Sequence, residues 1–256
     1  MANELAGRHA LVTGGGRGIG AAIAAALLAE GARVTLLARD SARLEQAAAG
    51  LGREVGFAVA DVADAAQVER AFSSARARAG DVHILVNNAG QAASAPLGKT
   101  DEALWRQMLA VNLTGSYHCS RAALPAMLAG GHGRIVNIAS TAGLTGYAYC
   151  TAYCAAKHGV VGLTRALARE VATHGVTVNA VCPGFTDTDI VREAVVNIVE
   201  KTGRSEQQAV ETLVSHNPQR RLVRPEEVAN AVLWLCLPGS ESVTGQSIVV
   251  AGGELP

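Results

Sequence analysis

Short apolar runs alternate with longer helix-forming stretches along almost the whole chain. Continuous apolar runs of this length are typical of strands that are buried on both faces of a parallel sheet. They cover residues 8–13, 33–38, 54–60, 82–86, 134–139, 177–181 and 247–250. Helical patterns cover residues 21–30, 64–79 and 100–129, a stretch that contains Tyr153 and Lys157 and ends near residue 173, and residues 225–236. This alternation predicts one α/β domain over residues 1–256, a doubly wound, Rossmann-like parallel sheet of about seven strands.

The first apolar run stops at a glycine-rich turn, Gly14-Gly-Gly-Arg-Gly-Ile-Gly20, and a helix rich in alanine and leucine follows it. Glycines let the backbone approach a pyrophosphate closely, and a helix N-terminus offers free N–H groups and the positive end of a dipole. The strand, turn and helix therefore predict a dinucleotide-binding site.

The end of the second strand bears on the choice of cofactor. An acidic residue at this place binds the adenosine ribose hydroxyls in many dinucleotide folds. Here Ala38 stands there, followed by Arg39, and Arg17 lies within the glycine turn. Two guanidinium groups suit a 2′-phosphate, so we expect NADP(H). NAD(H) remains the alternative, with both arginines solvated and Asp40 on the ribose.

Polar residues also follow the next two strands. Asp61 could accept a hydrogen bond from adenine or cap the following helix. The amides of Asn87-Asn-Ala-Gly90 could bridge strands or line the cofactor site. Asn112 lies inside the long helical stretch, where asparagine is unfavourable. It marks either a bend held by a backbone hydrogen bond or a functional position.

A hydroxyl, a phenol and an ammonium group are predicted to meet near the middle of the chain. Ser140 follows the apolar run 134–139, so we expect it at the C-terminal end of a buried strand. Tyr153 and Lys157 are four residues apart and therefore share one helix face. A phenol has a pKa of about 10, and a nearby cation lowers it. These three groups predict a proton-transfer site; an exposed helix pair is the alternative. Tyr149 is a rival acid, but no lysine follows it four residues later.

Residues 189–218, the lid segment, are helical in pattern but interrupted near residues 202–205. A segment of this kind after a strand end is a candidate lid over a substrate. Two ordinary surface helices would give the same pattern.

Composition excludes several other functions. The formal net charge is zero and no run of Lys or Arg occurs, so we expect neither nucleic acid nor an anionic membrane as partner. No apolar stretch approaches the roughly 20 residues of a membrane span, and the N-terminus lacks a signal-peptide pattern. The five cysteines and seven histidines show no zinc or disulfide spacing. We therefore expect a cytoplasmic protein with reduced thiols and no metal site.

Together these features resemble the short-chain dehydrogenase/reductase family in its single-domain form, over almost the whole chain. The motifs stand in the family's order: Thr13-Gly14-x-x-x-Gly18-x-Gly20, Asp61, Asn87-Asn-Ala-Gly90, Asn112, Ser140, Tyr153-x-x-x-Lys157 and Pro183-Gly184. Residues 133–140 and 177–188 are most similar to 3-oxoacyl reductases, hydroxyacyl-CoA or hydroxybutyrate dehydrogenases, and polyketide ketoreductases.

The resemblance implies a role for each member of the proton-transfer set. Tyr153 would be the general acid in reduction and the general base in oxidation. Lys157 would lower the pKa of Tyr153 and bind the nicotinamide ribose. Ser140 would donate to the substrate oxygen, and Asn112 would hold a water that links Lys157 to solvent.

The resemblance also implies the cofactor contacts. Around the pyrophosphate and adenosine we expect Thr13, Gly14, Arg17, Gly18, Ile19, Gly20 and Arg39. On adenine and the adenosine side we expect Asp61, Val62, Asn88 and Gly90. At the nicotinamide end we expect Pro183, Gly184, Thr186 and Thr188, together with Tyr153 and Lys157. A homotetramer is implied as well, with contacts through the helix that carries Tyr153 and through the last helix and strand.

Three functions follow from the sequence. The first is an NADP(H)-dependent oxidoreductase of a ketone or secondary alcohol, with a 3-oxoacyl/3-hydroxyacyl thioester or related ketone as the leading substrate. The second is an NAD-dependent dehydrogenase of a hydroxy acid, sugar or cyclic alcohol. The third is a non-catalytic dinucleotide-binding protein that regulates through partners.

Overall fold

Seven parallel strands form one sheet in the order β3-β2-β1-β4-β5-β6-β7 in the computed structural model, which describes residues 3–52 and 55–255. The strands are β1 (His9–Thr13), β2 (Arg33–Ala38), β3 (Gly56–Val59), β4 (Ile84–Asn87), β5 (Gly133–Ile138), β6 (Val176–Pro183) and β7 (Ser247–Val250). The chain runs outward from β1 to β3 and returns to place β4 beside β1. The expected doubly wound parallel sheet is confirmed.

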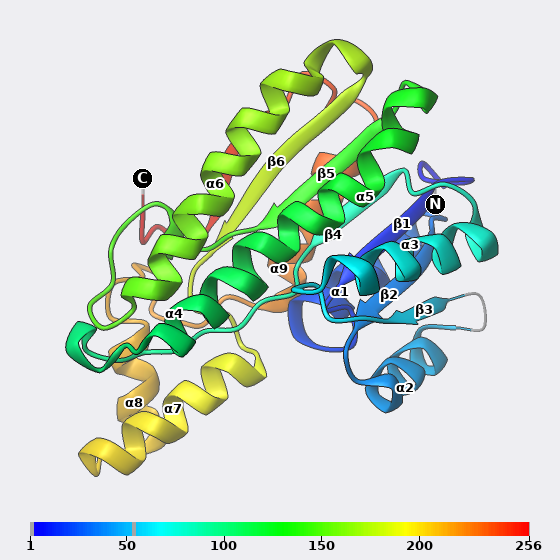
Figure 1. The fold of residues 1–256 in the computed structure, drawn as a ribbon. Coiled ribbons are helices and arrows are strands. Elements are labelled where there is room, and N and C mark those ends of the chain that lie inside the picture. Colours follow the sequence, from blue (N-terminus) through cyan, green and yellow to red (C-terminus); the bar gives the residue numbers. More distant parts are fainter. Residues whose placement is uncertain (1–2, 53–54, 256) are drawn as a thin grey trace.

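Helices cover both faces of the sheet (Figure 1). They are α1 (Gly18–Ala29), α2 (Ser41–Leu51), α3 (Ala65–Ala79), α4 (Glu102–Leu109), α5 (Gly115–Gly130), α6 (Thr151–Val171), α7 (Asp189–Thr202), α8 (Glu206–Leu213) and α9 (Pro225–Cys236). One face packs on α1, α2 and α9, and the other on α3, α5 and α6. No helix in the described part of the chain is long and apolar enough to cross a membrane.

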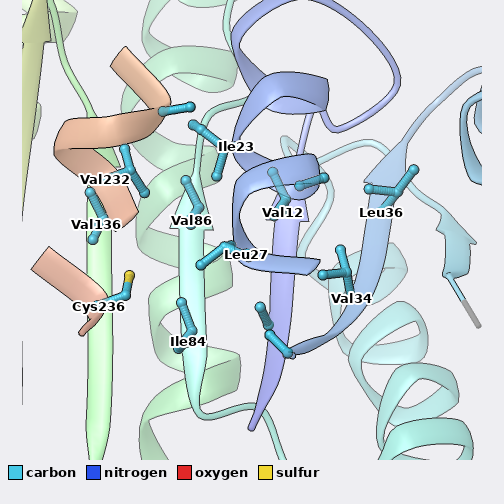
Figure 2. Packing of buried hydrophobic residues seen from close by; sticks show 14 of the residues in the cluster. Val12, Ile23, Leu27, Val34, Leu36, Ile84, Val86, Val136, Val232 and Cys236 are labelled. Carbon is cyan, nitrogen blue, oxygen red and sulfur yellow. The ribbon is translucent and has the colours of Figure 1, made fainter. Parts of the chain in front are cut away.

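Successive strand residues enter opposite cores because side chains alternate across a sheet. In β1, Val12 lies in the core under α1 and α9, while Leu11 lies in the core under α3 and α5. Figure 2 shows the first of these cores, where Ile23 and Leu27 of α1 meet Val232 of α9 across the sheet residues. Burial on both faces explains why the strands are continuous apolar runs.

Several element boundaries differ from the expectations. The third strand begins at Gly56, and Glu54, where we expected it to start, lies outside the described residues. The sixth strand is longer than expected because its pairing with β7 extends to Pro183. Helix α2 was missed: only Leu44 and Ala48 of it are buried, so its apolar pattern is weak.

The expected long helix over residues 100–129 is divided in two. A π-helical turn, Ala110–Thr114, separates α4 from α5 and contains Asn112. A π turn inserts an extra residue into a helix and often marks a functional position. The irregularity expected near Asn112 is therefore present in the form of a π turn.

Three histidines gather at the amino edge of the sheet, away from the glycine turn. The ring of His9 bonds Gly80 O at 2.8 Å and Thr35 Oγ1 at 2.9 Å, and its backbone N–H donates to His83 Nδ1 at 3.1 Å. The rings of His83 and His132 are 6.4 Å apart. Burial lowers the pKa of all three, that of His132 to about 4, where Arg134 and Arg8 add to the effect.

We predict that these histidines make the fold sensitive to acid. The unfolded chain binds a proton at His132 near the ordinary pKa of 6.5, whereas the folded chain does so only near 4. Between these values the free energy of unfolding falls as pH falls. Urea unfolding of the wild type and of His132→Gln at pH 7 and pH 5 should show a smaller acid loss in the variant. Equal losses in both proteins would contradict the prediction.

Candidate active site

The carboxyl ends of β1, β4, β5 and β6 lie along one edge of the sheet, because parallel strands all point the same way. In open α/β sheets, ligands bind at this edge where the strand order reverses, which here is between β1 and β4. The glycine turn (residues 14–20), the Asn87-Asn-Ala-Gly90 segment, Ser140 and the segment after Pro183 all start from it.

The glycine turn leaves space that side chains would fill. Gly14 and Gly18 have positive φ angles of 64° and 51°, which favour glycine. A Cβ on Gly20 would lie 2.3 Å from Gly14 O, so only glycine lets α1 start this close to β1. Among the described residues no side chain caps α1, and its first N–H groups can therefore bind an anion. Ile19 packs against the core below the turn.

Thr13 and Asn88 join the ends of β1 and β4. Thr13 Oγ1 accepts from Asn88 N and Ala89 N, both at 2.9 Å. The Asn88 side chain donates to Thr13 O at 2.9 Å and Gly14 O at 3.2 Å. Asn87 bridges strands instead, since its Nδ2 donates to Asn137 Oδ1 of β5 at 2.8 Å. One amide of the pair thus holds the sheet together, and the other holds the glycine turn.

At the adenosine end, charged residues pair within the chain. Arg39 Nη1 lies 3.7 Å from Asp61 Oδ2, and both side chains are accessible. Asp61 does not cap α3, because Asp64 does so, accepting from Ala66 N and Gln67 N. Val62 is buried against α5, where its Cγ2 lies 2.6 Å from the position a Cβ on Gly115 would take.

Asp40, the alternative ribose ligand, is engaged elsewhere. It is the N-cap of α2, and its side chain accepts from Arg43 N at 3.1 Å. A carboxylate in this place stabilises the positive end of the helix. Asp40 is therefore less available for a ribose than its sequence position suggested.

Ser140, Tyr153 and Lys157 are brought together as expected. Ser140 comes two residues after the end of β5, and its hydroxyl lies near enough to the phenol of Tyr153, in the first turn of α6, to lower the pKa of that phenol. Lys157, one turn later, is buried at 5% exposure, and its Nζ lies 5.8 Å from the Tyr153 ring centroid. The ammonium group donates to Ile138 O at 2.8 Å. The alternative of an exposed helix pair is wrong.

The pKa values differ from the expectation in one respect. Burial raises the pKa of Tyr153 to about 12, against the opposing effect of the nearby Ser140 hydroxyl. Burial also lowers the pKa of Lys157 to about 8. The net shift of the Tyr153 pKa is thus opposite to the expected lowering, because loss of solvation is the largest effect on the phenol and the ammonium group donates its hydrogen bond to a backbone carbonyl.

Asn112 lies beside this set. Its Nδ2 donates to Met108 O at 2.9 Å and Gln91 O at 3.0 Å, and its Oδ1 accepts from Gln91 N at 3.2 Å. A Cβ on Gly90 would lie 2.8 Å from Asn112 Oδ1 and 3.6 Å from Lys157 Nζ. Asn112 thus joins the π turn to the segment after β4. Because Gly90 has no side chain, the space beside Asn112 Oδ1 and Lys157 Nζ stays open.

Tyr147 and Tyr149 have different surroundings. The Tyr147 hydroxyl bonds Thr141 Oγ1 at 2.8 Å and also the Glu254 carboxylate. Burial and this carboxylate raise the pKa of Tyr147. Tyr149 is 64% exposed with a positive φ of 66° and has no contact with Ser140 or Lys157 among the described contacts. Tyr149 is therefore a poor rival for Tyr153.

Sequence reasoning missed Glu254. It comes from the C-terminal segment, and its Oε2 lies 2.9 Å from the position a Cβ on Gly184 would take. Gly184 follows Pro183 at the end of β6, and its N–H donates to Val250 O of β7 at 3.1 Å. No local signal marks Glu254, because its partner Tyr147 is 107 residues away.

The residues that lead into the lid segment, and its first residue, contact the glycine turn. Thr186 Oγ1 donates to Gly184 O at 3.0 Å, and Thr188 Oγ1 donates to Thr186 O at 3.2 Å. The Thr188 methyl group lies 3.2 Å from where a Cβ on Gly18 would be. At the same point Arg17 forms an ion pair with Asp189, the first residue of α7.

Comparisons with known proteins agree with this geometry. The model of the family described as short chain dehydrogenase matches residues 8–198. A ketoacyl reductase of the granaticin polyketide synthase from Streptomyces violaceoruber is 43% identical over 95% of this chain and 92% of its own. The D-beta-hydroxybutyrate dehydrogenase of Cupriavidus necator is 40% identical over 97% and 98% of the two chains.

Solved structures agree as well. A crystal structure of an actinorhodin polyketide ketoreductase variant with NADPH superposes with a TM-score of 0.94, at 38% identity and 99% coverage of both chains. The family match and these near end-to-end similarities favour an enzyme over a non-catalytic regulator. The chain is an oxidoreductase of the short-chain dehydrogenase family, whose members bind NAD(P)(H) and interconvert alcohol and carbonyl groups.

Proposed function

We propose that this protein is an NADP(H)-dependent reductase of a ketone, with a 3-oxoacyl thioester or a related ketone as substrate. The observation that carries the proposal is the meeting of Ser140, Tyr153 and buried Lys157 at the sheet edge that also bears the glycine turn. Residues 1–256 act as one catalytic domain, with residues 189–218 as the substrate lid. Ketoacyl reductases among the relatives support the substrate class.

The residues present fit a dinucleotide. The positive φ angles at Gly14 and Gly18 and the close approach at Gly20 leave room for a pyrophosphate beside the N-terminus of α1. Arg17 and Arg39 would hold the 2′-phosphate, and Thr186 and Thr188 the nicotinamide end. When bound, the cofactor supplies or accepts the hydride.

The protein's own part is proton transfer. In reduction, the Tyr153 hydroxyl donates its proton to the carbonyl oxygen, and the Ser140 hydroxyl donates a hydrogen bond to the same atom. A pKa of about 12 keeps the phenol protonated at neutral pH, as a general acid requires. The Lys157 ammonium group stabilises the phenolate that remains. Asn112 holds the π turn beside Lys157 in place.

The side-chain carboxylate of Glu254 favours an uncharged substrate. Glu254 bonds Tyr147, which in turn bonds Thr141, the residue next to Ser140. A free carboxylate on the substrate would be repelled by this charge, whereas a thioester or neutral ketone would not. This contact supports the leading substrate over a hydroxy acid.

We predict that Tyr153→Phe removes turnover and retains cofactor binding. The phenylalanine keeps the ring but has no proton to donate, and loss of a general acid costs about 10²- to 10⁴-fold in rate. NADPH oxidation with acetoacetyl-CoA measures turnover, and fluorescence titration measures NADPH binding. Tyr149→Phe is the matched control and should retain activity. If Tyr153→Phe turns over normally, Tyr153 is not the acid.

We also predict that ketone reduction slows as pH rises through about 8, the pKa of buried Lys157. Above this pH the lysine loses the charge that stabilises the phenolate, while Tyr153 remains protonated. Single-turnover rates between pH 6.5 and pH 10 check the prediction. A rate that stays constant to pH 10 would show that the lysine charge plays no part.

We propose a homotetramer whose contacts involve α6, α9 and β7. Trp234 of α9 is 48% exposed, which is unusual for a side chain of this size unless a partner covers it. We expect light scattering after gel filtration to give four times the chain mass, and Trp234→Glu to reduce that mass. A monomeric wild type would refute the assembly.

A further inference from the structure

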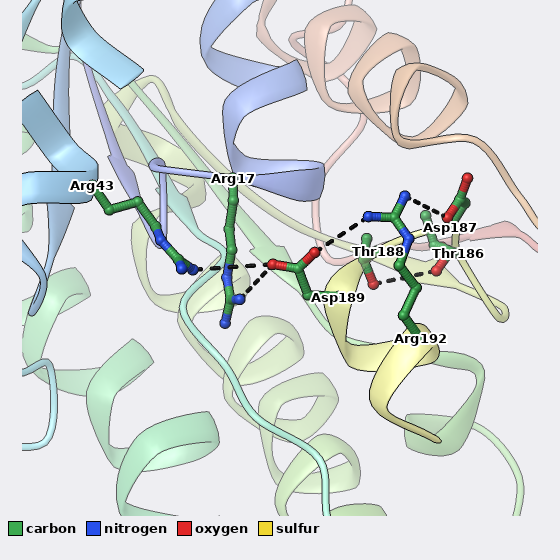
Figure 3. A network of polar contacts seen from close by, with 7 residues as sticks. All are labelled: Arg17, Arg43, Thr186, Asp187, Thr188, Asp189 and Arg192. Carbon is green, nitrogen blue, oxygen red and sulfur yellow. Dashed lines mark hydrogen bonds and ion pairs between the residues drawn. The ribbon is translucent and has the colours of Figure 1, made fainter. Parts of the chain in front are cut away.

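Asp189, the first residue of α7, forms ion pairs with arginines from three parts of the chain (Figure 3). Its Oδ2 lies 2.5 Å from Arg17 Nη1 and 4.0 Å from Arg43 Nη1. Its Oδ1 lies 3.4 Å from Arg192 Nη1. The carboxylate therefore lies between the glycine turn, α2 and the lid segment, which are far apart in sequence.

Two of these arginines belong to the part of the fold that faces the adenosine ribose. Arg17 lies in the glycine turn and is the N-cap residue of α1. Arg43 lies in the first turn of α2, directly after the end of β2, where dinucleotide folds place the ribose. Its Cγ lies 3.4 Å from where a Cβ on Gly16 would be, so its stem lies over the glycine turn.

We propose that Arg43 joins Arg17 and Arg39 in binding the 2′-phosphate of NADP(H), and that Asp189 competes for Arg17 and Arg43 and so sets the strength of the preference for NADP(H). Asp189 is then a specificity-determining residue that acts from the lid segment. This inference rests on the proposed function. It also adds Arg43 to the phosphate ligands, a residue that the sequence did not single out.

The phosphate and the Asp189 carboxylate compete for the same arginines, and the phosphate carries the larger charge. A phosphate monoester carries close to two negative charges at neutral pH and offers three acceptor oxygens, whereas Asp189 carries one charge. The side chains of Arg17, Arg43 and Asp189 are 41–49% exposed, so water screens their pairs, and exposed ion pairs are weak. The phosphate therefore displaces the carboxylate at a modest loss of affinity.

Asp187 provides a matched control. It lies two residues before Asp189, just ahead of the lid segment, and contacts Arg192 Nη2 at 3.0 Å, with no pairing to Arg17 or Arg43 in the described contacts. Asp187→Asn removes one negative charge at the entry to the lid segment, as Asp189→Asn does at its first residue. A general effect of lid charge would appear in both variants, and competition for the two arginines only in Asp189→Asn.

The experiment is a fluorescence titration of wild type, Asp189→Asn, Asp187→Asn and Arg43→Gln with NADPH and with NADH. We expect Asp189→Asn to tighten NADPH binding relative to NADH by about two- to fivefold. We expect Asp187→Asn to leave this ratio unchanged, and Arg43→Gln to weaken NADPH binding with little effect on NADH. Both wild-type arginine–carboxylate pairs are accessible, so the substitutions should not disturb folding, and thermal unfolding checks this.

Several outcomes would overturn the inference. Equal weakening of both cofactors in Asp189→Asn would mean that the ion pair only fastens the lid segment to the glycine turn. The same ratio shift in Asp187→Asn would indicate a general charge effect. Unchanged NADPH affinity in Arg43→Gln would remove Arg43 from the site, and this test of Arg43 does not depend on whether Asp189→Asn folds. A wild type that prefers NADH refutes the proposed cofactor, whereas the inference depends on the change of ratio between variant and wild type.

Discussion

Parallel pairing of β1 with β4 is the constraint on which the site depends. The register sets Val12 opposite Val86, so the next residues of both strands leave the sheet at the same height. Thr13 and Asn88 then meet and bond each other through side chain and backbone. The glycine turn on one strand and the amide segment on the other are therefore held side by side, at the point where the strand order reverses.

Burial shapes the chemistry of the proton-transfer set. Loss of solvation raises the pKa of Tyr153 and lowers that of Lys157, so the phenol keeps its proton to a higher pH than the ammonium group does. A buried ammonium group needs partners, and Lys157 finds one in Ile138 O at the end of β5. The same strand end is followed by Ser140, so the end of β5 positions both Ser140 and Lys157.

The lid segment is attached by weaker forces. Helices α7 and α8 pack on each other through a small apolar cluster that includes Val191, Val195 and Ala209, separate from the two main cores. At its start the segment contacts the glycine turn through Thr188 and through exposed ion pairs of Asp189, each worth about 0–1 kcal/mol. A segment held this way can move without disturbing the sheet, as a substrate lid requires.

The sequence by itself determined where the strands lie along the chain, the glycine turn and the grouping of Ser140 with Tyr153 and Lys157. These are local properties: apolar runs reflect burial on both faces, and a spacing of four residues fixes two side chains on one helix face. The same local reasoning missed α2, whose buried positions are few. It also placed the bend at Asn112, because asparagine is unfavourable inside a helix.

Only the tertiary structure decided which of several roles each polar residue takes. Asn87 bridges strands while Asn88 holds the glycine turn, Asp64 caps α3 in place of Asp61, and Asp40 caps α2. The contacts of Arg17 with Asp189 and of Tyr147 with Glu254 join residues 172 and 107 positions apart. The direction of the Tyr153 pKa shift is also decided by the tertiary structure, because it follows from burial of the phenol. Contacts between distant segments and the depth of burial arise only when the chain has folded, so no local pattern in the sequence encodes them.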